Sequence, residues 1–157
     1  MSLPPESLKR FLVTAKQATY AATGGSASVA PLLPDSKQLE FIEGELLYRD
    51  IYVGTNRFVG LETVYLAGRA IWAMSYAGGL SPDVPSTNVG TVYAFLRQAL
   101  RTLPSEQPLR GPPLFEQGAL RYTCHCTGSI SGFDGTETVS AGNASLYQLH
   151  FAGGLVT

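Results

Sequence analysis

Apolar residues recur with two different spacings along the chain, and these spacings predict helices alternating with groups of strands. Apolar positions three or four residues apart, typical of a helix with one buried face, extend from about Glu6 to Ala21 and from about Ser86 to Leu103. The small, proline-containing stretches that follow, Gly25–Lys37 and Ser105–Pro113, are predicted to be loops. Alternating apolar and polar residues predict strands at Glu45–Val53, Phe58–Leu66, Ala70–Tyr76, Ala119–Thr127, Phe133–Ser140 and Ser145–Phe151.

The two halves of the chain carry matching residues in the same order. When the segment that starts at Phe41 is aligned with the segment that starts at Phe115, aromatic, glycine and acidic positions coincide. The aligned pairs include Tyr48 with Tyr122, Gly60 with Gly135, and Glu62 with Glu137. We therefore predict a single domain over residues 1–157, made of two pseudo-repeats at about 5–80 and 86–156. The predicted fold is α+β, with duplicated helix–β–β–β units forming an antiparallel sheet of about six strands and two helices packed on one face.

The composition excludes several classes of protein. Of the 157 residues, 45% are hydrophobic and 15% are charged, which excludes a disordered chain. The net charge of −1 excludes a polycationic protein that binds nucleic acid or a membrane surface. No stretch approaches the ~18 uninterrupted apolar residues of a membrane-spanning helix, and the first residues lack the apolar run of a signal peptide. The chain is predicted to be cytoplasmic.

Alternation along the predicted strands sorts their side chains into two faces. One face is apolar and aromatic in both halves, yet it also carries three carboxylates. This combination predicts a ligand pocket between the two halves, with aromatic walls and with acids that select the charge of the ligand. The predicted ligand-binding residues are the walls Tyr48, Tyr52, Trp72, Tyr76 and Tyr122, and the acids Asp50, Glu62 and Glu137.

The three carboxylates also have a structural interpretation. A buried carboxylate must be paired, hydrogen-bonded, protonated or exposed to a cavity. Lys16, Arg49 or Arg97 could supply the pairing cation, and tyrosine hydroxyls could supply hydrogen bonds. If the helices fill the aromatic face, its residues are core, and a ligand site would move to the opposite face around Arg49, His125 and His150.

Motifs for metals, cofactors and covalent catalysis are absent from the sequence. Cys124 and Cys126 are too close along a strand to bridge easily, and alternation places His125 on the other face, so no metal site is predicted. No phosphate-binding glycine-rich loop occurs, and the glycine pairs of "YAGGL" and "FAGGL" are predicted to end strands. No cofactor and no catalytic residue is assigned.

Several motifs resemble a known family. They include "YRD" at Tyr48–Asp50, the run from Phe58 through Glu62, and "RGPPLFEQG" at the start of the second repeat. On these residues the chain resembles domain of unknown function 5680, a bacterial family found alone or appended to helix-turn-helix regulators of XRE type. The resemblance implies a regulatory context and no particular reaction. The predicted topology is also a permuted form of that in GyrI-like effector-binding domains, which hold small ligands between their halves.

These observations favour a non-enzymatic, effector-binding-like domain that takes a small organic ligand, polar or cationic. Two alternatives stay open. An enzyme would need two of the carboxylates close enough to flank one substrate as general acid and base. A protein-interaction module would pair through an exposed sheet edge or form a homodimer.

Overall fold

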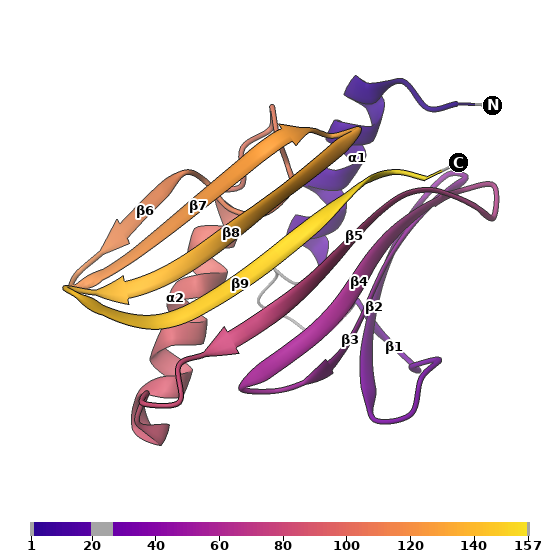
Figure 1. Ribbon diagram of the computed structural model, residues 1–157. Coiled ribbons are helices and arrows are strands. Elements are labelled where there is room, and N and C mark those ends of the chain that lie inside the picture. Colours follow the sequence, from indigo (N-terminus) through magenta and orange to yellow (C-terminus); the bar gives the residue numbers. More distant parts are fainter. Residues whose placement is uncertain (1, 20–26, 157) are drawn as a thin grey trace.

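The computed structural model describes residues 2–19 and 27–156, which form two helices and one large sheet (Figure 1). Helix α1 spans Pro5–Ala18, and helix α2 spans Val89–Arg101 after the short 3-10 helix η1 at Ser86–Asn88. The strands are β1 (Ser28–Val29), β2 (Ser36–Glu43), β3 (Leu46–Gly54), β4 (Arg57–Leu66), β5 (Arg69–Leu80), β6 (Leu114–Gln117), β7 (Leu120–Ser129), β8 (Gly132–Ala141) and β9 (Ala144–Leu155).

All strands pair antiparallel in the order β1-β2-β3-β4-β5-β9-β8-β7-β6, which confirms the α+β class with an antiparallel sheet. The predicted number of about six strands is wrong, because the described part of the chain forms nine. Of the three additional strands, β1 and β6 form the two edges of the sheet, and β2 lies between β1 and β3. Exposure on both faces removes the apolar–polar alternation, as in β1 and in most of β6.

Two of the predicted segment boundaries need correction. Helix α1 ends at Ala18, three residues before the predicted end at Ala21, which lies outside the described residues. The predicted loop Gly25–Lys37 contains β1 and the first residues of β2 from Ser36 onward, and its first two residues also lie outside the described part. The second predicted loop, Ser105–Pro113, contains no helix or strand.

The two meanders β1–β5 and β6–β9 meet where β5 pairs with β9, with Tyr76 opposite Phe151. The glycine pairs predicted to end strands instead lie inside β5 and β9. A Cβ added at Gly78 would meet Gln148 O at 2.2 Å, so the two strands can approach only because no side chain is present there. The superposition of the two halves remains a prediction.

Both helices lie on one face of the sheet (Figure 1). Lys16 of α1 bonds to Glu62, whereas Tyr93 of α2 packs on Phe58. Glu62 and Phe58 both lie on β4 and are four positions apart, so their side chains share one face of the sheet. The buried core lies between the helices and this face. Within the described residues, neither helix is long and apolar enough to cross a membrane.

Candidate functional site

The first acidic cluster in the core is built around Glu62 on β4. Its carboxylate and the ammonium group of Lys16 are both fully buried, with Lys16 Nζ 3.1 Å from Glu62 Oε2. Lys16 also donates a hydrogen bond to the carbonyl of Leu109 at 2.5 Å, and the Tyr48 hydroxyl donates to Glu62 Oε1. The pairing with Lys16 and a tyrosine agrees with the structural interpretation of this acid.

A similar cluster surrounds Glu137 on β8. Arg110 Nη2 lies 2.5 Å from Glu137 Oε1, and the Arg110 side chain is only 6% exposed. The hydroxyls of Tyr122 and Tyr147 donate to the same carboxylate at 2.6 and 2.8 Å. Tyr122 in turn accepts a hydrogen bond from the backbone N–H of Gly111 at 3.0 Å. The segment that follows α2 thus supplies the cation for the second cluster, whereas α1 supplies it for the first.

The third acid, Asp50, differs from the other two. It lies directly opposite Glu62 in the β3–β4 register and is 3% exposed. The Tyr76 hydroxyl donates to its Oδ1 at 2.5 Å, and this is the only hydrogen bond that the described residues make to its side chain. Burial, and then the nearby Glu62 charge, raise the pKa of Asp50 to about 7. A large fraction of Asp50 is therefore protonated near neutral pH.

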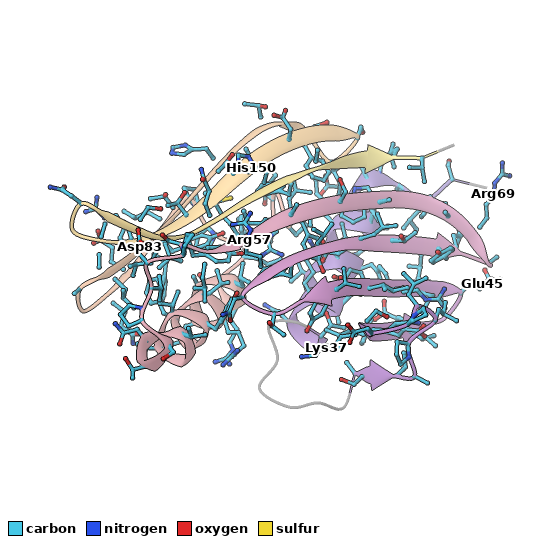
Figure 2. All side chains as sticks on the ribbon, turned by 60° about the horizontal axis from the view of Figure 1, so that its bottom comes forward. Lys37, Glu45, Arg57, Arg69, Asp83 and His150 are labelled. Carbon is cyan, nitrogen blue, oxygen red and sulfur yellow. The ribbon has the colours of Figure 1, made fainter. Side chains whose placement is uncertain are left out.

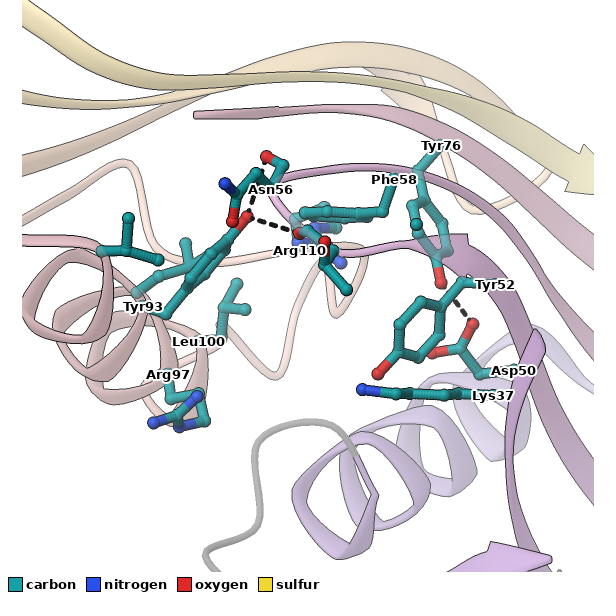
Figure 3. Close-up of a pocket in the computed structure, with 14 residues that line it drawn as sticks. Lys37, Asp50, Tyr52, Asn56, Phe58, Tyr76, Tyr93, Arg97, Leu100 and Arg110 are labelled. Atoms are coloured by element: carbon teal, nitrogen blue, oxygen red, sulfur yellow. Dashed lines mark hydrogen bonds between the residues drawn. The ribbon is translucent and has the colours of Figure 1, made fainter. Parts of the chain in front are cut away.

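Asp50 lines a pocket of about 400 Å³ between the first half of the sheet and α2 (Figure 3). This volume lies within the ~300–1,000 Å³ range of small-molecule sites. One wall is formed by β2–β5 and the β3–β4 hairpin, the other by α2, and Arg110 adds a side chain from the segment after α2. The pocket thus lies between the first half of the sheet and a helix of the second.

Aromatic rings form the centre of the pocket wall. Phe58 contacts Tyr52, Tyr76 and Tyr93, with ring centroids 6.3, 6.0 and 6.4 Å away. The single proton of the Tyr93 hydroxyl is shared between the backbone carbonyls of Thr55 and Asn56 in the hairpin, at 3.0 and 3.1 Å, as the dashed lines in Figure 3 show. These bonds fix α2 against the β3–β4 hairpin and hold this side of the pocket in place.

Three cations also line the pocket. Lys37 Nζ lies 6.0 Å from the Tyr52 ring centroid, and the Arg110 guanidinium lies 5.7 Å from that of Tyr76. Arg97 projects from α2 on the opposite wall (Figure 3). Among the described residues, Lys37 and Arg97 form no ion pair, whereas Arg110 is paired with Glu137.

The corresponding region of the second half has a different composition. Where β3 and β5 carry Asp50, Tyr52 and Tyr76, the aligned positions carry Cys124, Cys126 and Phe151. Gln107 covers this region by donating to the carbonyl of Gly128 at 3.2 Å and by approaching Cys126 Sγ at 3.9 Å. Burial and the Glu137 charge raise the pKa of Cys124 to about 11, so its thiol is protonated at neutral pH.

The eight predicted ligand-binding residues therefore separate into two groups. Asp50, Tyr52 and Tyr76 line the pocket. The other five do not: Tyr48, Glu62, Trp72, Tyr122 and Glu137 are fully buried beneath the helices. Sequence reasoning missed the pocket residues Lys37, Tyr93 and Arg110 as ligand-binding candidates. The "RGPPLFEQG" motif was the available signal for Arg110.

The opposite face of the sheet, predicted as the alternative location, carries neither of the two helices of the described residues (Figure 1). Arg49 on this face pairs with Glu40 at 2.9 Å. Figure 2 shows His150 on the side of the sheet away from the helices, and it borders a second hollow of about 480 Å³. His150 Nδ1 lies 3.4 Å from Thr136 Oγ1, and both side chains lie on the same face as the exposed Ala77.

No group of three or more metal-binding side chains occurs among residues 2–19 and 27–156.

A comparison with protein families gives a match to this chain. The family model described as a domain of unknown function (DUF5680) matches residues 50–156, which is more than half of the chain. The matched span begins at Asp50 and includes α2 and all of β4–β9, so it contains most of the pocket lining. No curated protein and no solved structure matches the chain.

Proposed function

The chain belongs to the DUF5680 family, and we propose that it is a non-enzymatic domain that binds a small organic ligand in the pocket between β2–β5 and α2. The observation that carries the proposal is a buried carboxyl group in an aromatic pocket. Asp50 accepts a single hydrogen bond from the described residues, from Tyr76, although a carboxylate can accept several. A ligand that donates a hydrogen bond to Asp50 would satisfy this remaining capacity.

The aromatic lining supports binding by packing rather than by covalent chemistry. Tyr52, Phe58 and Tyr93 offer large apolar surfaces to a ligand, and burial of such surface contributes roughly 25 cal/mol per Å². The alternative of an enzyme with paired carboxylates gains no support from this geometry. Of the three acids, only Asp50 lines the pocket, while Glu62 and Glu137 are paired with cations in the core.

Binding of the uncharged fluorescent probe phenylnaphthylamine tests the proposal. We expect saturable binding at one site and a marked loss of affinity in Val89→Trp, because Val89 is half-buried at the α2 wall and an indole there would occupy the pocket. Ile42→Trp is the matched control, since Ile42 is 66% exposed on β2 and does not line the pocket. Melting curves show whether each variant stays folded. The proposal is wrong if the probe does not bind, or if the folded Val89→Trp protein binds it as tightly as the control.

A further inference from the structure

The side chains around the pocket carry an excess of positive charge. Lys37, Arg97 and Arg110 line it together with one acid, Asp50, although the chain as a whole has a net charge of −1. Glu137 balances Arg110 through a bond of 2.5 Å. Lys37 and Arg97 are both exposed, and neither forms an ion pair with a described residue. They come from opposite walls of the pocket, β2 and α2 (Figure 3).

Two aromatic rings of the pocket that could bind a cationic ligand already have a cationic side chain of the protein over them. The Lys37 ammonium lies over the Tyr52 ring and the Arg110 guanidinium over the Tyr76 ring. A cationic ligand would have to displace or approach these like charges, which is unfavourable. An anionic group at the opening would instead form charge-assisted hydrogen bonds with Lys37 and Arg97.

The acid and the cations differ in burial. Asp50 is 3% exposed, whereas Lys37 and Arg97 belong to the exposed residues of the chain. A negatively charged group is therefore favoured near the opening and disfavoured beside Asp50. The apolar part of the ligand would fit between, against Phe58, Tyr93 and the α2 leucines, with a hydrogen-bond donor at its inner end.

From this arrangement, and resting on the proposed function, we infer that the pocket takes an aromatic or otherwise apolar organic acid, whose anionic group is held between Lys37 and Arg97. The sequence predicted a cationic ligand instead, and the competition experiment described next distinguishes a cationic from an anionic ligand. The inference assigns Lys37 and Arg97 as binding residues that determine specificity, and Asp50 as the residue that meets the inner end of the ligand.

Competition against bound phenylnaphthylamine separates an anion from a cation of the same size. Naphthalene sulfonate and naphthylmethylammonium carry the same ring system with opposite charge. We expect the sulfonate to displace the probe at a concentration at least about tenfold lower than the ammonium, equivalent to about 1.4 kcal/mol. Equal displacement, or stronger displacement by the ammonium, would overturn the inference.

Substitutions at the opening test the assigned residues. Lys37→Gln and Arg97→Gln should each weaken sulfonate binding several-fold more than they weaken binding of the uncharged probe, and the double substitution should widen this difference. Arg69→Gln is the control, because it removes the same charge from an exposed residue at the β4–β5 turn, far from Lys37 (Figure 2). Sulfonate binding unchanged in the double variant, or weakened equally in the control, contradicts the inference. Failure of the uncharged probe to bind contradicts the proposed function instead, so the two results are distinguishable.

Discussion

Replacing Glu62 with glutamine tests how the core tolerates its charges. Both members of the Lys16–Glu62 pair are fully buried, so neither is screened by water. Glutamine preserves the shape of the side chain and can still accept the hydrogen bond from Tyr48. The change therefore removes one charge and leaves the Lys16 ammonium buried without its counterion. Breaking a buried pair in this way costs about 3–5 kcal/mol.

Two neighbouring groups reduce that cost. Glu62 contributes to the raised pKa of Asp50, so its neutralisation relieves repulsion between the two acids. Burial already lowers the pKa of Lys16, and without Glu62, which raises it, the amine can lose its proton more easily. We therefore expect the free energy of unfolding at pH 7 to fall by about 3 kcal/mol, near the lower end of the range for a broken buried pair. For a chain of this length that corresponds to a melting temperature lower by about 6–12 °C.

Urea denaturation followed by tryptophan fluorescence measures this change. The single tryptophan, Trp72, is fully buried, and Lys16 Nζ lies 5.6 Å from its ring. Glu116→Gln is the matched control, because Glu116 pairs with Arg121 on the surface, with side chains 49% and 60% exposed. Exposed pairs contribute about 0–1 kcal/mol. A loss below about 1 kcal/mol for Glu62→Gln, or a loss equal to that of the control, would refute the reasoning.

Two further substitutions address the pocket acid and the junction of the two halves. Because the pKa of Asp50 is raised from 3.8 to about 7, the folded state binds this proton more tightly, and stability falls as the pH rises from about 4 to about 7. Asp50→Asn should remove this loss of stability. Measured by urea denaturation, the variant should be more stable than the parent protein at pH 8, by up to about 4 kcal/mol, and similarly stable at pH 4. A variant that is less stable than the parent at pH 8 contradicts the prediction. Gly78→Ala should lower the melting temperature through overpacking of about 1–3 kcal/mol, since its Cβ would meet backbone 2.2 Å away. Gly132→Ala, whose Cβ meets nothing within 4 Å, should melt near the parent, and equal melting of the two variants would contradict the expected clash.

The sequence predicted strands well where one face of the strand is buried. Strands β4, β5, β8 and β9 lie in the middle of the sheet and alternate between buried and exposed residues over much of their length, so a period of two is visible. Strands β1 and β6 lie at the two edges and are short and largely exposed. Their positions follow from pairing with a neighbour, which a local pattern does not encode.

The pairing of the acids was predictable only in part. Lys16 was one of three candidate cations, and the structure places it on the buried face of α1, where a charge requires a partner. Arg110 was not a candidate, because it lies in a segment without helix or strand, whose path has no periodicity to follow. The residues that line the pocket were likewise predictable only in part. Alternation on β3 and β5 identified Asp50 and Tyr76, whereas Tyr93 and Arg97 depend on how α2 is placed across the sheet.

The comparison of the two halves bears on why Asp50 is present at all. Glu62 and Glu137 occupy aligned positions, and each is paired with a buried cation and accepts a hydrogen bond from a tyrosine hydroxyl. Each half of the chain therefore offsets the charge of its own buried glutamate. Asp50 and Tyr76 align instead with Cys124 and Phe151, which pack on the core without any ionised group. The fold therefore accommodates apolar side chains at these positions, and burying a carboxyl there costs free energy. Stability alone does not account for the acid, whereas the proposed ligand, by donating a hydrogen bond to Asp50, would.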